Sequence, residues 1–215
     1  MCNEITTDST IERMLFLPKL IAKKFAKLMM VPGSSEFNLL QYLPRLAKRF
    51  SEVCMIAILI YRSKIRINLF KCMSLLASFP MLDNLQLSAR GWEEVTDIFA
   101  DHEDDEKNLF SFKSLTIFDL QNQNDKVDHN FLKSRHIGHM FPKLETFSFT
   151  YTPKCSICGI TNINDTDDDD EMTLRGCAFR AAEPWLKVCT KEVQITLLPN
   201  KMSFTFTKKD LRELE

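Results

Sequence analysis

The sequence predicts an α/β fold in which short parallel strands form the inside of a repeated structure and helices cover its outside. Three observations support this prediction. One apolar spacing recurs from residue 50 onward, residues 1–49 have a helical pattern, and the C-terminal stretch alternates as a β-hairpin does. A strand followed by a helix, repeated in one direction, produces a parallel sheet with helices on its outer side.

Residues 1–49 are expected to form a helical N-terminal region. The polar residues 1–8 are expected to fray, and Ser9 or Thr10 can cap a first helix. A third helix is expected to begin at Ser34 or Ser35 and to restart at Pro44 toward residue 50.

Between them, a second helix is expected to begin at Pro18, because proline suits a first helical turn. One face of this helix would be apolar and the other basic: Leu17, Ile21, Phe25 and Leu28 on the first, Lys19, Lys23 and Lys27 on the second. A basic amphipathic helix can lie on a membrane. Because the third helix offers an apolar partner, we expect the second helix to pack against the protein instead.

The repeat consists of an aromatic residue followed by apolar residues three, six and eight positions later. Four copies begin at Phe50, Phe79, Phe112 and Phe141, which lie 29, 33 and 29 residues apart. The predicted inward sets are Val53, Ile56 and Ile58; Leu82, Leu85 and Leu87; Leu115, Phe118 and Leu120; and Leu144, Phe147 and Phe149. The predicted strands are 53–60, 85–87, 117–120 and 146–151, and the predicted helices are 68–78, 92–100 and 127–140.

The remaining sequence completes a domain of residues 50–215. A run of aspartates with few core-forming residues predicts a flexible acidic insertion at about 160–172. A helix is expected over 174–186, ended or bent by Pro184. Segments 192–197 and 202–206 predict a terminal β-hairpin. Val193 and Ile195 are candidates for a fifth, altered repeat.

The period and the L-x-x-L-x-L core resemble those of leucine-rich-repeat proteins over roughly residues 50–150. The resemblance implies a short, irregular solenoid with the N-terminal helices and the C-terminal hairpin as caps. The Asn or Cys that the family carries after the strand is replaced here, by Tyr61, Arg90, Gln123 and Thr152. The usual side-chain ladder at that turn is therefore in doubt. The alternative is an ordinary α/β or α+β domain whose strands share a composition by chance.

In such a repeat, the residues between the inward ones line the exposed strand surface. Outward residues on the first strand are apolar, namely Met55, Ala57 and Leu59, which suggests that the helical region folds over it. Ile117 is predicted to point outward on the third strand. The candidate partner-binding residues are Gln86, Ser88, Asp119, Gln121, Thr146, Ser148 and Thr150.

Residues 17–50 are similar in order to an F-box, a small helical module that its family joins directly to leucine-rich repeats. The similarity rests on Leu17-Pro18, Ile21, Phe25, Leu28, Leu39-Leu40, Leu46 and Lys48-Arg49-Phe50. It implies docking to the adaptor of a cullin–RING ubiquitin ligase, with the repeats selecting the substrate. Lys19 stands where acidic residues are usual, and Pro44 is an addition. The alternative is a helical cap without ligase contact.

A second functional hypothesis is a small zinc-dependent domain. Cys155 and Cys158 form a C-x2-C pair, and His136 and His139 lie upstream. Two such pairs could supply the four ligands of a tetrahedral zinc site. Unremarkable thiols and exposed histidines are the simpler interpretation, and a generic repeat scaffold needs no cofactor.

The remaining features favour a non-enzymatic protein that binds another protein. No nucleotide, P-loop or G-x-S-x-G fingerprint occurs, so no catalytic residue is predicted, although an unrecognised α/β enzyme stays open. A net charge of −1 argues against nucleic acid, and no apolar run reaches the ~18–20 residues of a membrane span. The seven scattered cysteines favour a reducing intracellular location, cytoplasm or nucleus.

Overall fold

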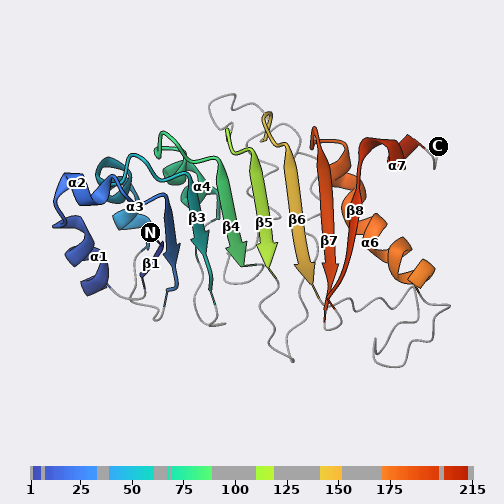
Figure 1. Cartoon of the computed structure of the whole chain (residues 1–215), viewed down its shortest axis with the longest axis horizontal. Helices are drawn as coiled ribbons and strands as arrows, with labels where there is room; N and C mark the ends of the chain where they lie inside the picture. Colours follow the sequence, from blue (N-terminus) through green and yellow to red (C-terminus); the bar gives the residue numbers. More distant parts are fainter. Residues whose placement is uncertain are drawn as a thin grey trace.

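The computed structural model describes residues 2–5, 8–32, 39–60, 67, 69–88, 110–118, 141–151, 171–198 and 201–212. These residues form one sheet with helices against it (Figure 1). The strands are β1 (Cys2–Ile5), β2 (Lys27–Met30), β3 (Met55–Ile58), β4 (Asn84–Ser88), β5 (Ser114–Phe118), β6 (Thr146–Tyr151), β7 (Glu192–Leu197) and β8 (Met202–Phe206). The helices are α1 (Asp8–Leu15), α2 (Lys19–Ala22), α3 (Leu39–Arg49), α4 (Leu69–Leu76), α6 (Glu171–Leu186) and α7 (Lys208–Arg212).

The strands lie side by side in sequence order, and the sheet is not closed. β1 to β7 are parallel to one another, and β8 pairs antiparallel with β7. The chain is therefore a mixed α/β protein with a mostly parallel sheet, as its sequence predicts at this level.

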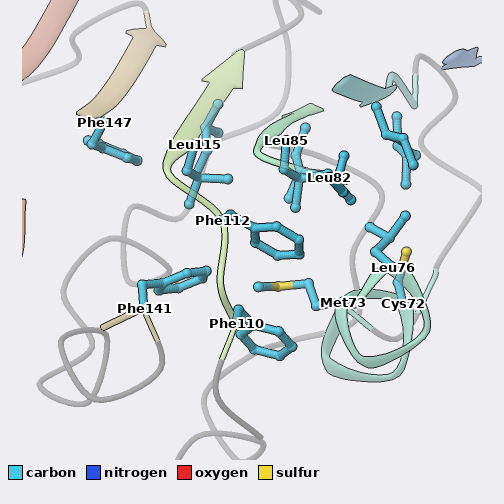
Figure 2. Close-up of a cluster of buried hydrophobic side chains, with 14 of the residues drawn as sticks. Cys72, Met73, Leu76, Leu82, Leu85, Phe110, Phe112, Leu115, Phe141 and Phe147 are labelled. Atoms are coloured by element: carbon cyan, nitrogen blue, oxygen red, sulfur yellow. The ribbon is translucent and has the colours of Figure 1, made fainter. Parts of the chain in front are cut away.

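The core lies between one face of the sheet and the helices. Buried and accessible residues alternate along β5 and β7. Most of the buried residues of the strands face the side of the sheet on which α3, α4 and α6 lie. Figure 2 shows one part of this core, where Cys72, Met73 and Leu76 of α4 lie near Leu82 and Leu85. Three phenylalanines, Phe110, Phe112 and Phe141, adjoin them and contact one another at ring-centroid distances of 5.6 to 6.5 Å.

A repeated backbone contact joins successive units just before each strand. The N–H groups of Asp83 and Asn84 both donate to the carbonyl of Cys54, each at 3.0 Å. In the next unit, Lys113 and Ser114 donate in the same way to the carbonyl of Asp83, at 2.8 and 3.0 Å. The carbonyls of Ala26, Lys113 and Glu145 each accept two N–H groups from the next unit in the same way. The pattern shows which residues of successive units are equivalent.

The third repeat begins three residues earlier than its sequence spacing suggests. Leu115 pairs with Leu85 and Phe147, and Ile117 pairs with Leu87 and Phe149. Phe112 thus occupies the position of Leu82, and the strand expected at 117–120 runs over 114–118 instead. The prediction was wrong because apolar residues at both 112 and 115 allow the repeat to be aligned in two ways, three residues apart. A shift by an odd number of residues exchanges the two faces of a strand. Ile117, expected outward, is buried, whereas Phe118 is only half-buried.

The N-terminal region is not all helical. β1 forms where fraying was expected, and β2 forms within the segment predicted as the second helix. That helix, α2, has one turn and ends at Ala22. The three-residue spacing from Phe25 to Leu28 is compatible with a helix, but Leu28 and Met30 also alternate as strand residues do, and β3 offers them a hydrogen-bonded neighbour. β3 is therefore not the first strand, and its apolar outward residues adjoin β2.

The C-terminal predictions are closer to the structure. β7 and β8 form the predicted hairpin, with Lys201 in its turn at a φ of 55°. Helix α6 begins at Glu171, so the last two residues of the predicted insertion are helical, and it continues to Leu186 past Pro184. Similarly, α3 is continuous through Pro44. The predicted helices 92–100 and 127–140, and residues 160–170 of the insertion, lie outside the described residues.

Candidate functional site

The face of the sheet opposite α3, α4 and α6 carries the candidate site. No helix in the described ranges packs over this face, and its side chains are mostly half-exposed. Strand register places one row of them across five strands, since Gln86 pairs with Thr116, Thr116 with Ser148, Ser148 with Gln194 and Gln194 with Thr205. We call this surface the open face; it comprises Met29, Met55, Leu59, Gln86, Ser114, Thr116, Phe118, Thr146, Ser148, Thr150, Gln194, Thr196, Ser203 and Thr205.

The chemistry of the open face changes along the sheet. Over β2 and β3 it is apolar, with Met29, Met55 and Leu59 half-buried. From β4 to β8 it consists mainly of hydroxyl and amide groups and carries no charge among the residues that define it. Charged residues border it: Lys27 and Glu192 are exposed at the strand starts, and Glu4 of β1 pairs in register with Met29. Such a surface can bury apolar area at one end and exchange hydrogen bonds at the other.

Some of these polar groups already have partners. At the hairpin, the side-chain amide of Gln194 donates to the Ser203 hydroxyl at 2.9 Å, and the hydroxyls of Thr196 and Ser203 are 3.2 Å apart. Within the described part of the chain, the side chains of Thr116, Ser148 and Thr150 make no hydrogen bond. The middle of the open face is therefore the part with free hydrogen-bonding capacity.

The structure places the sequence-predicted site residues unequally. Gln86, Thr146, Ser148 and Thr150 lie half-exposed on the open face. Asp119 and Gln121 lie outside the described residues. Ser88 follows Gln86 on the same side of β4 but is only 1% exposed, so the expectation that it is accessible was wrong. Its hydroxyl accepts a hydrogen bond from the backbone N–H of Ile60, because the chain leaving β3 closes over the end of β4.

The sequence prediction missed other members of the open face. Thr116 and Phe118 were missed because the third repeat was placed three residues too late. Gln194, Thr196, Ser203 and Thr205 were missed because the hairpin was treated only as a cap, although the polar alternation of 192–197 and 202–206 contained the signal.

Five of the eleven residues that carry the F-box resemblance are buried. Leu28, Leu39 and Leu46 lie in the core, and the rings of Phe25 and Phe50 meet edge to face at 5.5 Å and 84°. Because Leu28 belongs to β2, residues 27–30 are part of the sheet and not of a helical module. The other six are accessible: Pro18, Ile21 and Lys48 are exposed, and Leu17, Leu40 and Arg49 are half-buried.

Ionisable groups gather at the strand starts. Lys113 Nζ lies 2.8 Å from Asp83 Oδ2, and Lys191 Nζ lies 2.6 Å from Glu145 Oε2. The hydrogen bond to Asp83, followed by the charge of that carboxylate, raises the pKa of Lys113. These residues are substantially exposed, so they form a surface ladder and not a buried reactive group.

Metal ligands were a second expectation. Within the described ranges, no cluster of three or more His, Cys, Asp or Glu side chains could hold a metal ion, which leaves zinc without support there. The predicted ligands Cys155, Cys158, His136 and His139 lie outside the described residues.

In the described part of the chain, no helix is both long and apolar enough to cross a bilayer. No family, curated protein or solved structure matches the chain.

Proposed function

We propose that the chain is a non-enzymatic module that binds another protein across the open face. The observation that carries the proposal is the row from Gln86 through Thr116 and Ser148 to Gln194, which is accessible and uncharged beside an apolar margin. Large accessible surfaces that combine apolar area with adaptable hydrogen-bonding groups are typical of binding sites between proteins.

We further propose that the sheet belongs to a short, irregular leucine-rich-repeat solenoid. Support comes from parallel pairing in sequence order and from the equivalent carbonyls of Ala26, Cys54, Asp83 and Lys113, each of which accepts two N–H groups from the next unit. Repeat units bury their ends poorly and need caps. Helix α1 at one end and the hairpin β7–β8 at the other would serve as caps.

The chemistry of the open face restricts the partner. A partner would place apolar side chains against Met29, Met55 and Leu59, and neutral polar groups against the hydroxyl-rich strands. Because the open face has almost no charge, its binding should depend little on ionic strength. This property distinguishes it from an electrostatic contact elsewhere on the molecule.

The test is quantitative affinity capture with matched variants of the full chain. Thr116→Arg/Ser148→Arg introduces two guanidinium groups into the centre of the open face. The control, Ser74→Arg/Gly176→Arg, adds the same charge on exposed sides of α4 and α6, where a Cβ at Gly176 meets nothing within 4 Å. Thermal unfolding of each variant checks that the fold is retained.

A partner that the control retains and the open-face variant loses, at both low and high salt, would support the proposal. If every captured protein binds both variants equally, the open face is not the binding site. Docking to a cullin–RING adaptor stays a prediction of the resemblance and is not part of this proposal, since residues 27–30 belong to the sheet and not to a helical module.

A further inference from the structure

A second accessible surface lies at the opposite end of the sheet from α7, where α1 meets α2 (Figure 1). Phe16 is 83% exposed and Leu20 is 80% exposed, and Ile21 beside them is also exposed. We call these three residues the apolar tip. Bulky apolar side chains so exposed are uncommon in this molecule, and the tip is the one place in the described ranges where three occur within six residues.

The tip is held outward by its local structure. Phe16 follows α1, and its N–H still donates to the carbonyls of Glu12 and Arg13. Pro18, with ψ at 143°, then turns the chain before the single turn of α2. On the inner side, Ile11, Met14, Ala22 and Phe25 are buried. A small alanine therefore faces the core while Phe16 and Leu20 face solvent, and the anchored segment keeps the tip in place.

Basic residues are frequent in the sequence on both sides of the tip. Residues 11–30 contain five exposed basic side chains and one acidic residue, Glu12, for a net charge of +4: Arg13, Lys19, Lys23, Lys24 and Lys27. Glu4 and Asp8 precede this window and reduce the net charge of residues 1–30 to +2; the chain as a whole is −1, so this end is the more positive one. Across the part of the chain that the structure describes, none of the five pairs with a carboxylate.

We propose that this tip docks onto a bilayer surface that contains anionic phospholipid. Exposed aromatic and aliphatic residues within a lysine-rich surround are what interfacial membrane binding uses: the apolar groups enter the headgroup boundary and the lysines attract anionic lipid. Of the apolar face expected to pack against the third helix, Phe25 and Leu28 are buried, whereas Ile21 is exposed.

An acidic protein is the competing occupant, and two features favour the bilayer. Phe16 and Leu20 are too exposed to line a groove, whose walls would shield them from solvent, so the tip projects from the surface. Insertion of a projecting tip into a bilayer needs no complementary pocket. Four of the five basic residues are lysines, which protein interfaces disfavour relative to arginine. This contact is separate from the open face and does not depend on the proposed function.

The test is co-sedimentation of the full chain with vesicles of phosphatidylcholine, with and without phosphatidylserine. Phe16→Ser/Leu20→Ser removes the two most exposed side chains of the apolar tip, and Met81→Ser is its control, because Met81 is 55% exposed in the turn before β4. Lys19→Glu/Lys23→Glu reverses the charge at the tip. Lys143→Glu/Lys208→Glu makes the same charge change at exposed positions elsewhere, neither of which forms an ion pair within the described residues.

We expect the wild type to bind the phosphatidylserine vesicles in preference, and each tip variant to lose about tenfold or more of its partitioning, with the controls nearly unchanged. All substituted side chains are exposed, so unfolding temperatures should stay near that of the wild type. The open-face variant Thr116→Arg/Ser148→Arg should still bind.

Two results would overturn the proposal. One is a wild-type chain that does not sediment with phosphatidylserine vesicles; capture of an acidic protein that depends on the tip would then assign the surface to a protein partner. The other is equal loss in the tip variants and their controls, which would show general charge attraction without a docking site.

Discussion

The hydroxyl oxygen of Ser88 lies 3.0 Å from the backbone nitrogen of Ile60, and both residues are buried. The Ile60 N–H donates to this oxygen across two successive units of the sheet, from the chain after β3 to the end of β4. A backbone N–H just beyond a strand has lost its ladder partner, and burial makes such a group costly unless a side chain accepts from it. Ser88 supplies that acceptor.

Replacing Ser88 by alanine should therefore destabilise the protein. The substitution leaves the Ile60 N–H without this acceptor, and we expect the free energy of unfolding to fall by about 1–2 kcal/mol. Urea denaturation followed by circular dichroism measures the change. Ser148→Ala is the matched control on the open face and should change stability by less than about 0.5 kcal/mol. Equal effects of the two substitutions would contradict the structural role of Ser88.

Trp185 on α6 stacks on Phe147 of β6, with ring centroids 3.7 Å apart and planes at 5°. Both residues are buried, so Trp185→Ala should lower the free energy of unfolding by about 3–5 kcal/mol. Trp185→Phe should cost less than about 1.5 kcal/mol, because it keeps a ring on Phe147 and removes an indole N–H that has no acceptor among the described residues. Chemical denaturation of both variants measures the difference, and similar losses would refute the role of the stacked ring.

The general plan of the fold could be predicted because one apolar spacing repeats where the strands lie. Leu85 and Leu87 of β4 align with Phe147 and Phe149 of β6 through the β5 residues between them. Their common spacing predicts this alignment. The spacing was ambiguous in the third copy, where both 112 and 115 are apolar, and there the sequence alone could not choose the register. Pairing with the strands on either side decides it, which is a non-local effect.

Two other features depended on tertiary contacts that the local pattern does not encode. β2 is a strand because β1 and β3 flank it, although its residues also suit a helix. Ser88 has the outward position that alternation predicts, yet the backbone at Ile60 covers it. For the candidate site, alternation identified Gln86 and Ser148 but could not tell which outward side chains stay accessible.

The described cysteines should differ in reactivity. Burial raises the pKa of Cys189 to about 12, against a smaller lowering by the charge of Lys208, and burial also raises the pKa of Cys72. Thiolates are the reactive species, so raising the pH from 7 to 9 should leave both thiols protonated and unlabelled in the folded protein. Cys54 is half-buried and should be alkylated before the buried Cys72, Cys177 and Cys189.

Mass spectrometry of the peptides after iodoacetamide treatment measures this order, and labelling in urea provides the control. The raised pKa of Cys189 also implies that the free energy of unfolding falls as the pH rises from about 9 toward 12. In this range the thiol ionises in the unfolded chain but stays protonated in the folded one, which favours the unfolded state. Labelling of Cys189 as fast as Cys54 in the native protein would contradict its burial.

Gly176 offers a substitution that should stabilise the protein. It lies inside α6 and is exposed, and a Cβ at this position meets nothing within 4 Å. Gly176→Ala restricts the unfolded chain without a clash, so we expect a gain of about 0.5–1 kcal/mol in the free energy of unfolding. Thermal and urea unfolding measure it. A loss of stability would mean that this stretch of α6 is not a regular helix.

The strand starts carry alternating charge, from Asp83 to Lys113 to Glu145 to Lys191. The ion pairs at Asp83 and at Lys191 are exposed, and exposed pairs contribute little. Lys113→Glu, however, places three carboxylates at neighbouring positions and replaces attraction with repulsion. We expect a lower unfolding temperature than for Lys143→Glu, a control at an exposed lysine that makes no ion pair within the described residues.

Salt dependence separates this electrostatic effect from a change in packing. Added sodium chloride screens like charges at the surface, so the Lys113→Glu variant should recover part of its lost stability, while the Lys143→Glu variant should respond as the wild type does. Thermal melts at low and high salt measure both responses. If the two variants lose the same stability and respond alike to salt, the order of charges along the ladder has no energetic role, and the backbone contacts beneath it suffice to align the units.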